Sequence, residues 1–236
     1  SGIDRIAIRR GPAAIIDGSG ALTGSMGIDI QARQKTGSHM KAQAGGGSFG
    51  TYAGGSEVGL TSGGAGAELT LNWRRSRGDF EFIDRQGTRH TRRNSHHNQL
   101  NAVATGYQEI EDHQIDVTAL WSRWSGGVPG VSEFQGRFAE TRQTENHIIG
   151  ISNWEKKGLL EGDSWVIDAN GYLGTEMLFN DYDNTDVFPG GGTFRQQTDV
   201  YAVRGGLRQK LWSEAGHLFQ TALRTEYQLY DGDILQ

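Results

Sequence analysis

The chain has 236 residues, of which 36 are glycine, 3 are proline and none is cysteine. No segment approaches the roughly 20 apolar residues that a spanning helix needs, which excludes a helical membrane protein. The lack of cysteine excludes a disulfide framework and a thiolate metal site, and the net charge of −5 gives no reason to expect a nucleic-acid partner.

The first 33 residues contain a strand break and several turn glycines. Gly11-Pro12 ends the first strand, because proline fixes φ and lacks an N–H donor. The glycines between residues 18 and 27 permit tight turns in a crowded interior. Residues 1–10 lack the apolar core of a signal peptide, so we expect a trimmed or excised chain if the protein is exported.

The rest of the chain alternates apolar and polar side chains in segments of about ten residues or more, separated by Gly, Asn, Asp and Ser. This pattern predicts an all-β fold. The expected strands are 39–47, 49–60, 66–77, 98–108, 113–124, 142–154, 163–178, 195–210 and 217–230. Their lengths match tilted membrane strands better than the usual globular strand of about 5–6 residues.

The expected strands have one apolar and one polar face. In 219–229, Phe219, Leu223 and Leu229 lie on one side, and Gln220, Arg224 and Glu226 lie on the other. Segments 69–73 and 115–121 alternate in the same way. A lipid-facing and a lumen-facing side explain this pattern, although a soluble β-sandwich also alternates.

Short and long connections alternate along the chain. The short ones are expected near 61–65, 109–112, 155–162 and 211–216, and the long ones near 78–97, 125–141 and 179–194. Outer-membrane barrels have short periplasmic turns and long extracellular loops. In this orientation the extracellular interface of the membrane is marked by Trp73, Trp121 and Trp124. The periplasmic interface is marked by Trp154, Trp165 and Trp212.

Several motifs together resemble one protein family. Residues 3–14 (IDRIAIRRGPAA), 17–24 (DGSGALTG) and 28–30 (IDI) are similar to the end of the plug domain of TonB-dependent receptors of the siderophore and cobalamin type. Segments 47–52 (GSFGTY) and 77–80 (RGDF) resemble the opening barrel hairpins of that family. The chain departs from the family pattern at Ile16-Asp17 and at Ser25-Met26-Gly27.

The resemblance implies a domain organisation and a function. Residues 1–33 would be the C-terminal part of the plug, and residues 34–236 would be the N-terminal portion of a transmembrane antiparallel β-barrel. They would supply about nine of about 22 strands, and the other strands would come from missing sequence or another chain. The function implied is uptake of an iron-siderophore, cobalamin or similar scarce solute across the bacterial outer membrane.

The resemblance also implies partners. A TonB-type energy-transducing protein would bind through an N-terminal plug region outside these residues, and the wall would contact the bilayer and lipopolysaccharide. The alternative is a non-transporting surface adhesin or a soluble carbohydrate-binding β-sandwich. We expect neither enzyme activity nor a cofactor, because the sequence contains no Gly-x-Ser-x-Gly elbow, His-Glu-x-x-His or Walker motif.

Loop 78–97 is the main candidate for ligand binding. It concentrates positive charge that would steer an anionic solute, in Arg85, Arg89, His90, Arg92 and Arg93. The alternative partners for these cations are lipopolysaccharide phosphates or water. His96-His97 is expected to be a solvated pair, because adjacent strand residues point apart.

Two further sets of residues complete the candidates. Arg9 and Arg10 of the plug are expected to contact the inward-facing acids Glu68 and Glu226 of the barrel wall. Asp181, Asp183 and Asp186 are weak candidates for a loop-ordering calcium ion, since their spacing does not match an EF-hand and a solvated turn explains them better.

Overall fold

The computed structural model describes residues 5–10, 24–29, 36–129, 141–162, 165–184, 194–213 and 218–235. All regular structure in these ranges is β-strand. Within them there is no helix of the length and apolar character that crossing a membrane requires. The all-β prediction is confirmed.

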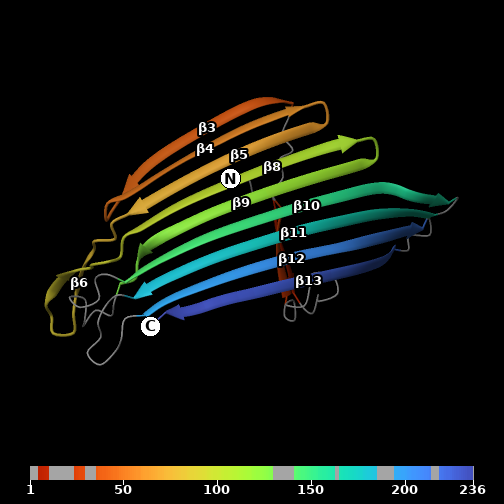
Figure 1. The fold of residues 1–236 in the computed structure, drawn as a ribbon. Coiled ribbons are helices and arrows are strands. Elements are labelled where there is room, and N and C mark those ends of the chain that lie inside the picture. Colours follow the sequence, from red (N-terminus) through yellow and green to blue (C-terminus); the bar gives the residue numbers. More distant parts are fainter. Residues whose placement is uncertain are drawn as a thin grey trace.

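Nine strands form one antiparallel sheet in which every strand pairs with its neighbours along the chain (Figure 1). The strands are β3 (Gly37–Gly47), β4 (Thr51–Ser62), β5 (Ala65–Ser76), β8 (His97–Ile110), β9 (His113–Gly127), β10 (Arg142–Gly162), β11 (Trp165–Asn184), β12 (Phe194–Ser213) and β13 (Leu218–Leu235). Each of the nine predicted strands corresponds to one of them. The sheet is curved and has β3 and β13 at its edges, as expected of a section of a barrel wall.

The connections define two ends of the sheet. Residues 63–64, 111–112, 163–164 and 214–217 connect strands at one end, which we call the turn end. Residues 48–50, 77–96, 128–141 and 185–193 connect them at the other, the loop end. Gly63 and Gly64 have φ of 58° and 81°, which gives the two-residue hairpin turn that matches strand twist.

Three expected connections differ from those in the structure. Segment 155–162 is not a turn, because β10 continues to Gly162 with an irregular register between Lys156 and Leu160. Loop 179–194 is shorter than expected, because β11 extends to Asn184 and β12 begins at Phe194. Loop 78–97 contains a small hairpin of its own, formed by β6 (Glu81–Ile83) and β7 (Arg89–Thr91).

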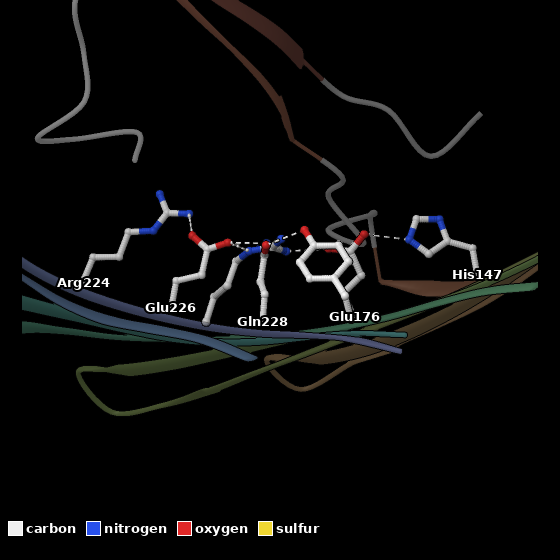
Figure 2. A network of polar contacts seen from close by, with 7 residues as sticks. His147, Glu176, Arg224, Glu226 and Gln228 are labelled. Atoms are coloured by element: carbon white, nitrogen blue, oxygen red, sulfur yellow. Dashed lines mark hydrogen bonds and ion pairs between the residues drawn. The ribbon is translucent and has the colours of Figure 1, made fainter. Parts of the chain in front are cut away.

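The register places apolar side chains of successive strands in rows on one face. One row runs through Trp121, Ile148, Met177, Tyr201 and Leu229 of β9 to β13. Other members of this face are Val58, Leu69, Leu173, Leu207 and Leu223, whose exposed fractions lie between 45% and 66%. We call this the outer face, because the polar side chains of the opposite, inner face project into the concavity of the sheet (Figure 2).

The sheet has almost no buried apolar core. Among the described residues only two apolar side chains, Ala169 and Ala202, are classed as buried. A soluble β-sandwich hides the apolar face of each sheet against a second sheet. Here the described residues place no second sheet over the outer face.

A separate hairpin is formed by β1 (Arg5–Arg10) and β2 (Gly24–Asp29), which pair antiparallel. Figure 1 shows this hairpin, in dark red, behind the large sheet, and Figure 2 shows it above the concave side. It therefore lies on the side of the inner face. The side chains of Arg9 and Arg10 are outside the described part of the chain, so their predicted contacts stay a prediction.

Strand register also bears on the tryptophan belts. Trp73 and Trp121 lie on the outer face near the loop end, as predicted. Trp124 lies on the inner face with Ser122, so its assignment to the lipid-facing aromatic belt at the extracellular interface is wrong. Trp154 is on the outer face beside Ile115, toward the turn end, and donates a hydrogen bond from Nε1 to His113 Nδ1 over 3.1 Å. The side chains of Trp165 and Trp212 are not described.

Candidate functional site

The inner face is the candidate functional surface, because strand alternation places ionisable and amide side chains there from every large strand. Paired residues of antiparallel strands point to the same side, so the register identifies its members. They include His39 and Lys41 of β3, Glu57 of β4, Glu68 and Asn72 of β5, Asn101 of β8, His147 of β10, Glu176 of β11, Arg204 of β12, and Glu226 and Gln228 of β13.

A polar network crosses β10 to β13 on this face (Figure 2). Arg204 donates from Nη1 to Glu176 over 2.6 Å and from Nε to Glu226 over 2.9 Å. The other carboxylate oxygen of Glu176, Oε1, lies 2.8 Å from His147 Nε2. Charge-assisted contacts of this kind are roughly twice as strong as neutral hydrogen bonds, so Arg204 links three strands through their side chains.

Glu226 has further partners at the edge strand. Arg224 Nη2 lies 3.8 Å from Glu226 Oε2, and Gln228 donates from Nε2 to Glu226 Oε1 over 2.7 Å. Glu226 lies on the inner face, as strand alternation predicts. Its contact with Arg204 does not follow from alternation, because it depends on how β12 and β13 align.

A second cluster lies at the turn end of β3, β4 and β5. His39 Nε2 is 3.2 Å from Glu57 Oε1 and 3.7 Å from Glu68 Oε2. Lys41 Nζ is 2.6 Å from Glu57 Oε1. The side chains of Glu57 and Glu68 are only 10% and 9% exposed, whereas that of Lys41 is 66% exposed. Two nearly buried carboxylates therefore share one imidazole, with a flexible cation at the margin.

The small β6–β7 hairpin places the predicted ligand-binding residues outside the nine-stranded sheet. Arg89 Nη1 lies 3.2 Å from Glu81 Oε2, and His90 Nε2 lies 2.7 Å from Asp84 Oδ2. The hydrogen bond from His90 and the N–H groups of Thr88 and Gln86 lower the pKa of Asp84 below its usual value. Arg85, Arg92 and Arg93 belong to the same segment. Acids of this loop thus neutralise part of its positive charge.

The structure contains a basic depression that the sequence pattern does not predict. A cavity of about 590 Å³ lies at the loop end of β5, β8, β9 and β10. Its lining includes Arg75, Arg77, His96, His97 and Arg142. By register Arg75 and Arg142 belong to the outer face, beside Trp73. These cations come from three segments that are distant in sequence, so no local pattern identifies them.

The structure describes two of the three calcium candidates, Asp181 and Asp183. Asp181 and Asp183 lie on the outer face of β11 near its end, and Asp181 receives two hydrogen bonds from Arg195. Asp186 lies outside the described residues. In the described part, the set of metal-ligating side chains that lie close enough to share an ion consists of His39, Glu57 and Glu68.

Comparison with known proteins gives a match in structure but not in sequence. No family model and no curated protein matches the chain. Among solved structures, the copper transporter OprC is similar with a TM-score of 0.72 and 16% sequence identity. The match covers 99% of this chain and 35% of the OprC chain, so this chain spans about a third of that protein's length. The chain therefore has the fold of part of that transporter.

Proposed function

We propose that this chain forms part of the wall and plug of a TonB-dependent transporter that takes up a scarce solute across the bacterial outer membrane. The observation that carries the proposal is the distribution of side chains in the sheet. Large apolar residues are exposed on the convex outer face, and the charged networks lie on the concave inner face. A membrane barrel with a wet, occupied lumen requires this arrangement.

The extent of the exposed apolar surface argues against the soluble alternatives. Leu207, Leu223 and Tyr227 are 58%, 66% and 66% exposed and belong to adjoining strands. Soluble monomers rarely expose contiguous apolar patches larger than a few hundred Å². Hydrocarbon chains of a bilayer would cover this surface directly. A carbohydrate-binding sandwich or a similar adhesin would need a second sheet over it, and the described residues place none there.

The edges of the sheet indicate what the complete barrel needs. β3 and β13 each have one unpaired edge in the described sheet. An open edge in hydrocarbon leaves backbone groups without partners, so further strands must pair with both. In this proposal they come from sequence outside these residues or from another chain. The β1–β2 hairpin on the inner side supports the assignment of residues 1–33 to the plug.

Three classes of solute fit this proposal. An iron-siderophore or cobalamin follows from the resemblance of the plug segment, and the name of the structural neighbour adds copper. Arg85, Arg89, His90, Arg92 and Arg93 would steer an anionic chelate at the loop end. Lipopolysaccharide would contact the outer face there, where Arg75 and Arg142 lie beside Trp73.

Uptake by the full-length protein in its own outer membrane tests the proposal. Cells would be given radiolabelled ferric siderophores, cobalamin and copper in turn, with and without the TonB-type protein. We expect uptake of one solute to depend both on this protein and on the energy transducer. Recovery of the protein in the soluble fraction without detergent, or equal uptake without the transducer, would contradict it.

A further inference from the structure

We propose that His39, Glu57 and Glu68 form a binding site for a divalent first-row transition-metal ion on the inner face. The three side chains come from three adjacent strands, and their ligating atoms all lie within 4.8 Å of one another. The proposal does not depend on transport, since it needs only the arrangement of β3, β4 and β5.

The distances between donor atoms suit a single ion. Bonds of about 2.0–2.1 Å at tetrahedral angles separate neighbouring ligand atoms by about 3.3 Å. His39 Nε2 lies 3.2 Å from Glu57 Oε1 and 3.7 Å from Glu68 Oε2. All three donor atoms lie within 4.8 Å of one another, so rotation of the side chains can bring them around one ion. One imidazole and two carboxylates leave a position for water or another ligand.

The backbone between the ligands is shaped for the imidazole. His39 pairs with Gly59, and Gly59 pairs with Glu68, so these three residues form one row across the sheet. A Cβ atom at position 59 would overlap the imidazole Cε1. Glycine thus allows the ring to lie across β4 and reach from β3 to β5, which any larger residue would obstruct.

The charge of the cluster also favours a cation. Two carboxylates that are at most 10% exposed lie close together on this face, beside Lys41, whose side chain is 66% exposed. Removing a carboxylate from water costs free energy, which a cation close to it offsets. A divalent ion compensates both carboxylates at once. It would displace the flexible Lys41 side chain from Glu57.

The donor set identifies the chemical class of the ion. Imidazole nitrogen and carboxylate oxygen suit Zn²⁺, Fe²⁺ and related ions, whereas Cu⁺ prefers sulfur ligands. Coordination through Nε2 requires a neutral imidazole that carries its proton on Nδ1. In the uncoordinated cluster Nε2 donates to a carboxylate, so the ring must rearrange its protons on binding. Zn²⁺ is a suitable probe because it has no redox chemistry.

The network around His147 provides a matched control. His147 also contacts a glutamate, with Nε2 2.8 Å from Glu176 Oε1. The third member there is the guanidinium of Arg204, which repels a metal ion. The two clusters share a histidine and a carboxylate on the same inner face. Within the described ranges, the His39 cluster alone has a second carboxylate close enough to share an ion.

Zn²⁺ binding to the full-length protein in detergent micelles tests the site. After treatment with a chelator, bound zinc is measured by equilibrium dialysis and elemental analysis. We expect His39→Gln and Glu68→Gln each to bind one equivalent less than the wild type at micromolar Zn²⁺. His147→Gln should retain the wild-type stoichiometry. Equal stoichiometry in the wild type and both ligand variants would overturn the proposal, as would an equal loss in His147→Gln.

Two variants that keep all three ligands provide a second test. Gly59→Ala inserts a methyl group where the imidazole lies, and we expect at least about tenfold weaker Zn²⁺ binding, comparable to the loss of a supporting partner. Lys41→Gln removes the competing cation, and we expect tighter binding. Unchanged affinity in Gly59→Ala or weaker affinity in Lys41→Gln would show that the cluster is an ion-pair network without a metal.

Discussion

Replacing Leu223 with arginine tests whether the outer face lies in lipid. Leu223 belongs to β13, is 66% exposed and pairs with Leu207 of β12. Its apolar neighbours on the outer face of β13 extend from Phe219 to Leu229. An apolar band of about 25 Å, crossed at a tilt of about 40°, takes about ten strand residues. Leu223 therefore lies close to the middle of the band.

At that depth an arginine on the lipid side costs about 2–4 kcal/mol. We expect Leu223→Arg to lower the free energy of unfolding of the full-length protein by this amount. Gln228→Arg is the control, because Gln228 lies on the inner face beside Glu226. Leu229→Arg, at the end of the band, should cost less than Leu223→Arg, since the penalty falls toward the interface.

Equilibrium unfolding in urea with lipid vesicles present measures all three variants under one condition. The order of destabilisation should be Leu223→Arg, then Leu229→Arg, then Gln228→Arg. If Leu223→Arg and Gln228→Arg differ by less than about 0.5 kcal/mol, within ordinary surface effects, the assignment of the outer face to lipid is refuted.

Three further predictions concern charged side chains. Arg204→Gln should destabilise the protein by about 1–2 kcal/mol, because it leaves two half-buried carboxylates without their shared cation. Urea unfolding of this variant is compared with that of Arg224→Gln, and an equal loss of unfolding free energy in the two variants would contradict the prediction. His90→Ala should raise the pKa of Asp84 toward the usual value of an aspartate, because it removes the hydrogen bond from the imidazole; ¹³C NMR of the carboxyl measures it. The lowered pKa of Asp84 stabilises the β6–β7 hairpin above about pH 4, and this stabilisation is lost as the pH falls through the folded value. Changing Arg89, Arg92 and Arg93 together to Gln should slow solute association and flatten its salt dependence, whereas uptake kinetics unchanged at two ionic strengths would assign these cations to lipopolysaccharide or water.

The strands were predictable because their causes are local. Alternation with a period of two identifies each strand, and turn residues such as Gly63-Gly64 separate neighbouring strands. A sheet of successive antiparallel neighbours needs no long-range information beyond this order. The same alternation correctly placed Glu68 and Glu226 on the inner face.

The end of β10 was not predictable in this way. Lys156-Lys157-Gly158 interrupts the apolar pattern and resembles a turn. In the structure Gly158 has a φ of 60° and donates its backbone N–H to Asp168 Oδ1 over 3.1 Å. The carboxylate of Asp168 on β11 thus accepts a hydrogen bond from the irregular backbone at Gly158, and β10 continues beyond it. Such compensation comes from the neighbouring strand and has no local signal in β10.

Side-chain partners require the register as well as the face. Arg204 lies opposite Glu226 but reaches Glu176 diagonally across the sheet. His39 reaches Glu68 only because the residue between them is Gly59. A shift of β12 by two residues would preserve every face and abolish the contacts of Arg204, and the same shift of β3 would abolish those of His39. The sequence pattern therefore predicts which residues face inward but not which of them meet.

In loop 78–97, side-chain partners that the sequence pattern does not predict change the expected electrostatic field. Counting its cations predicts a strongly positive loop, but the β6–β7 hairpin brings Glu81 to Arg89 and Asp84 to His90. Opposite charges at these distances reduce the field that a distant anion experiences. Arg75 and Arg142 instead lie around one depression at the rim. The field at the loop end therefore depends on both groups, and steering by the hairpin must be measured with the rim arginines intact.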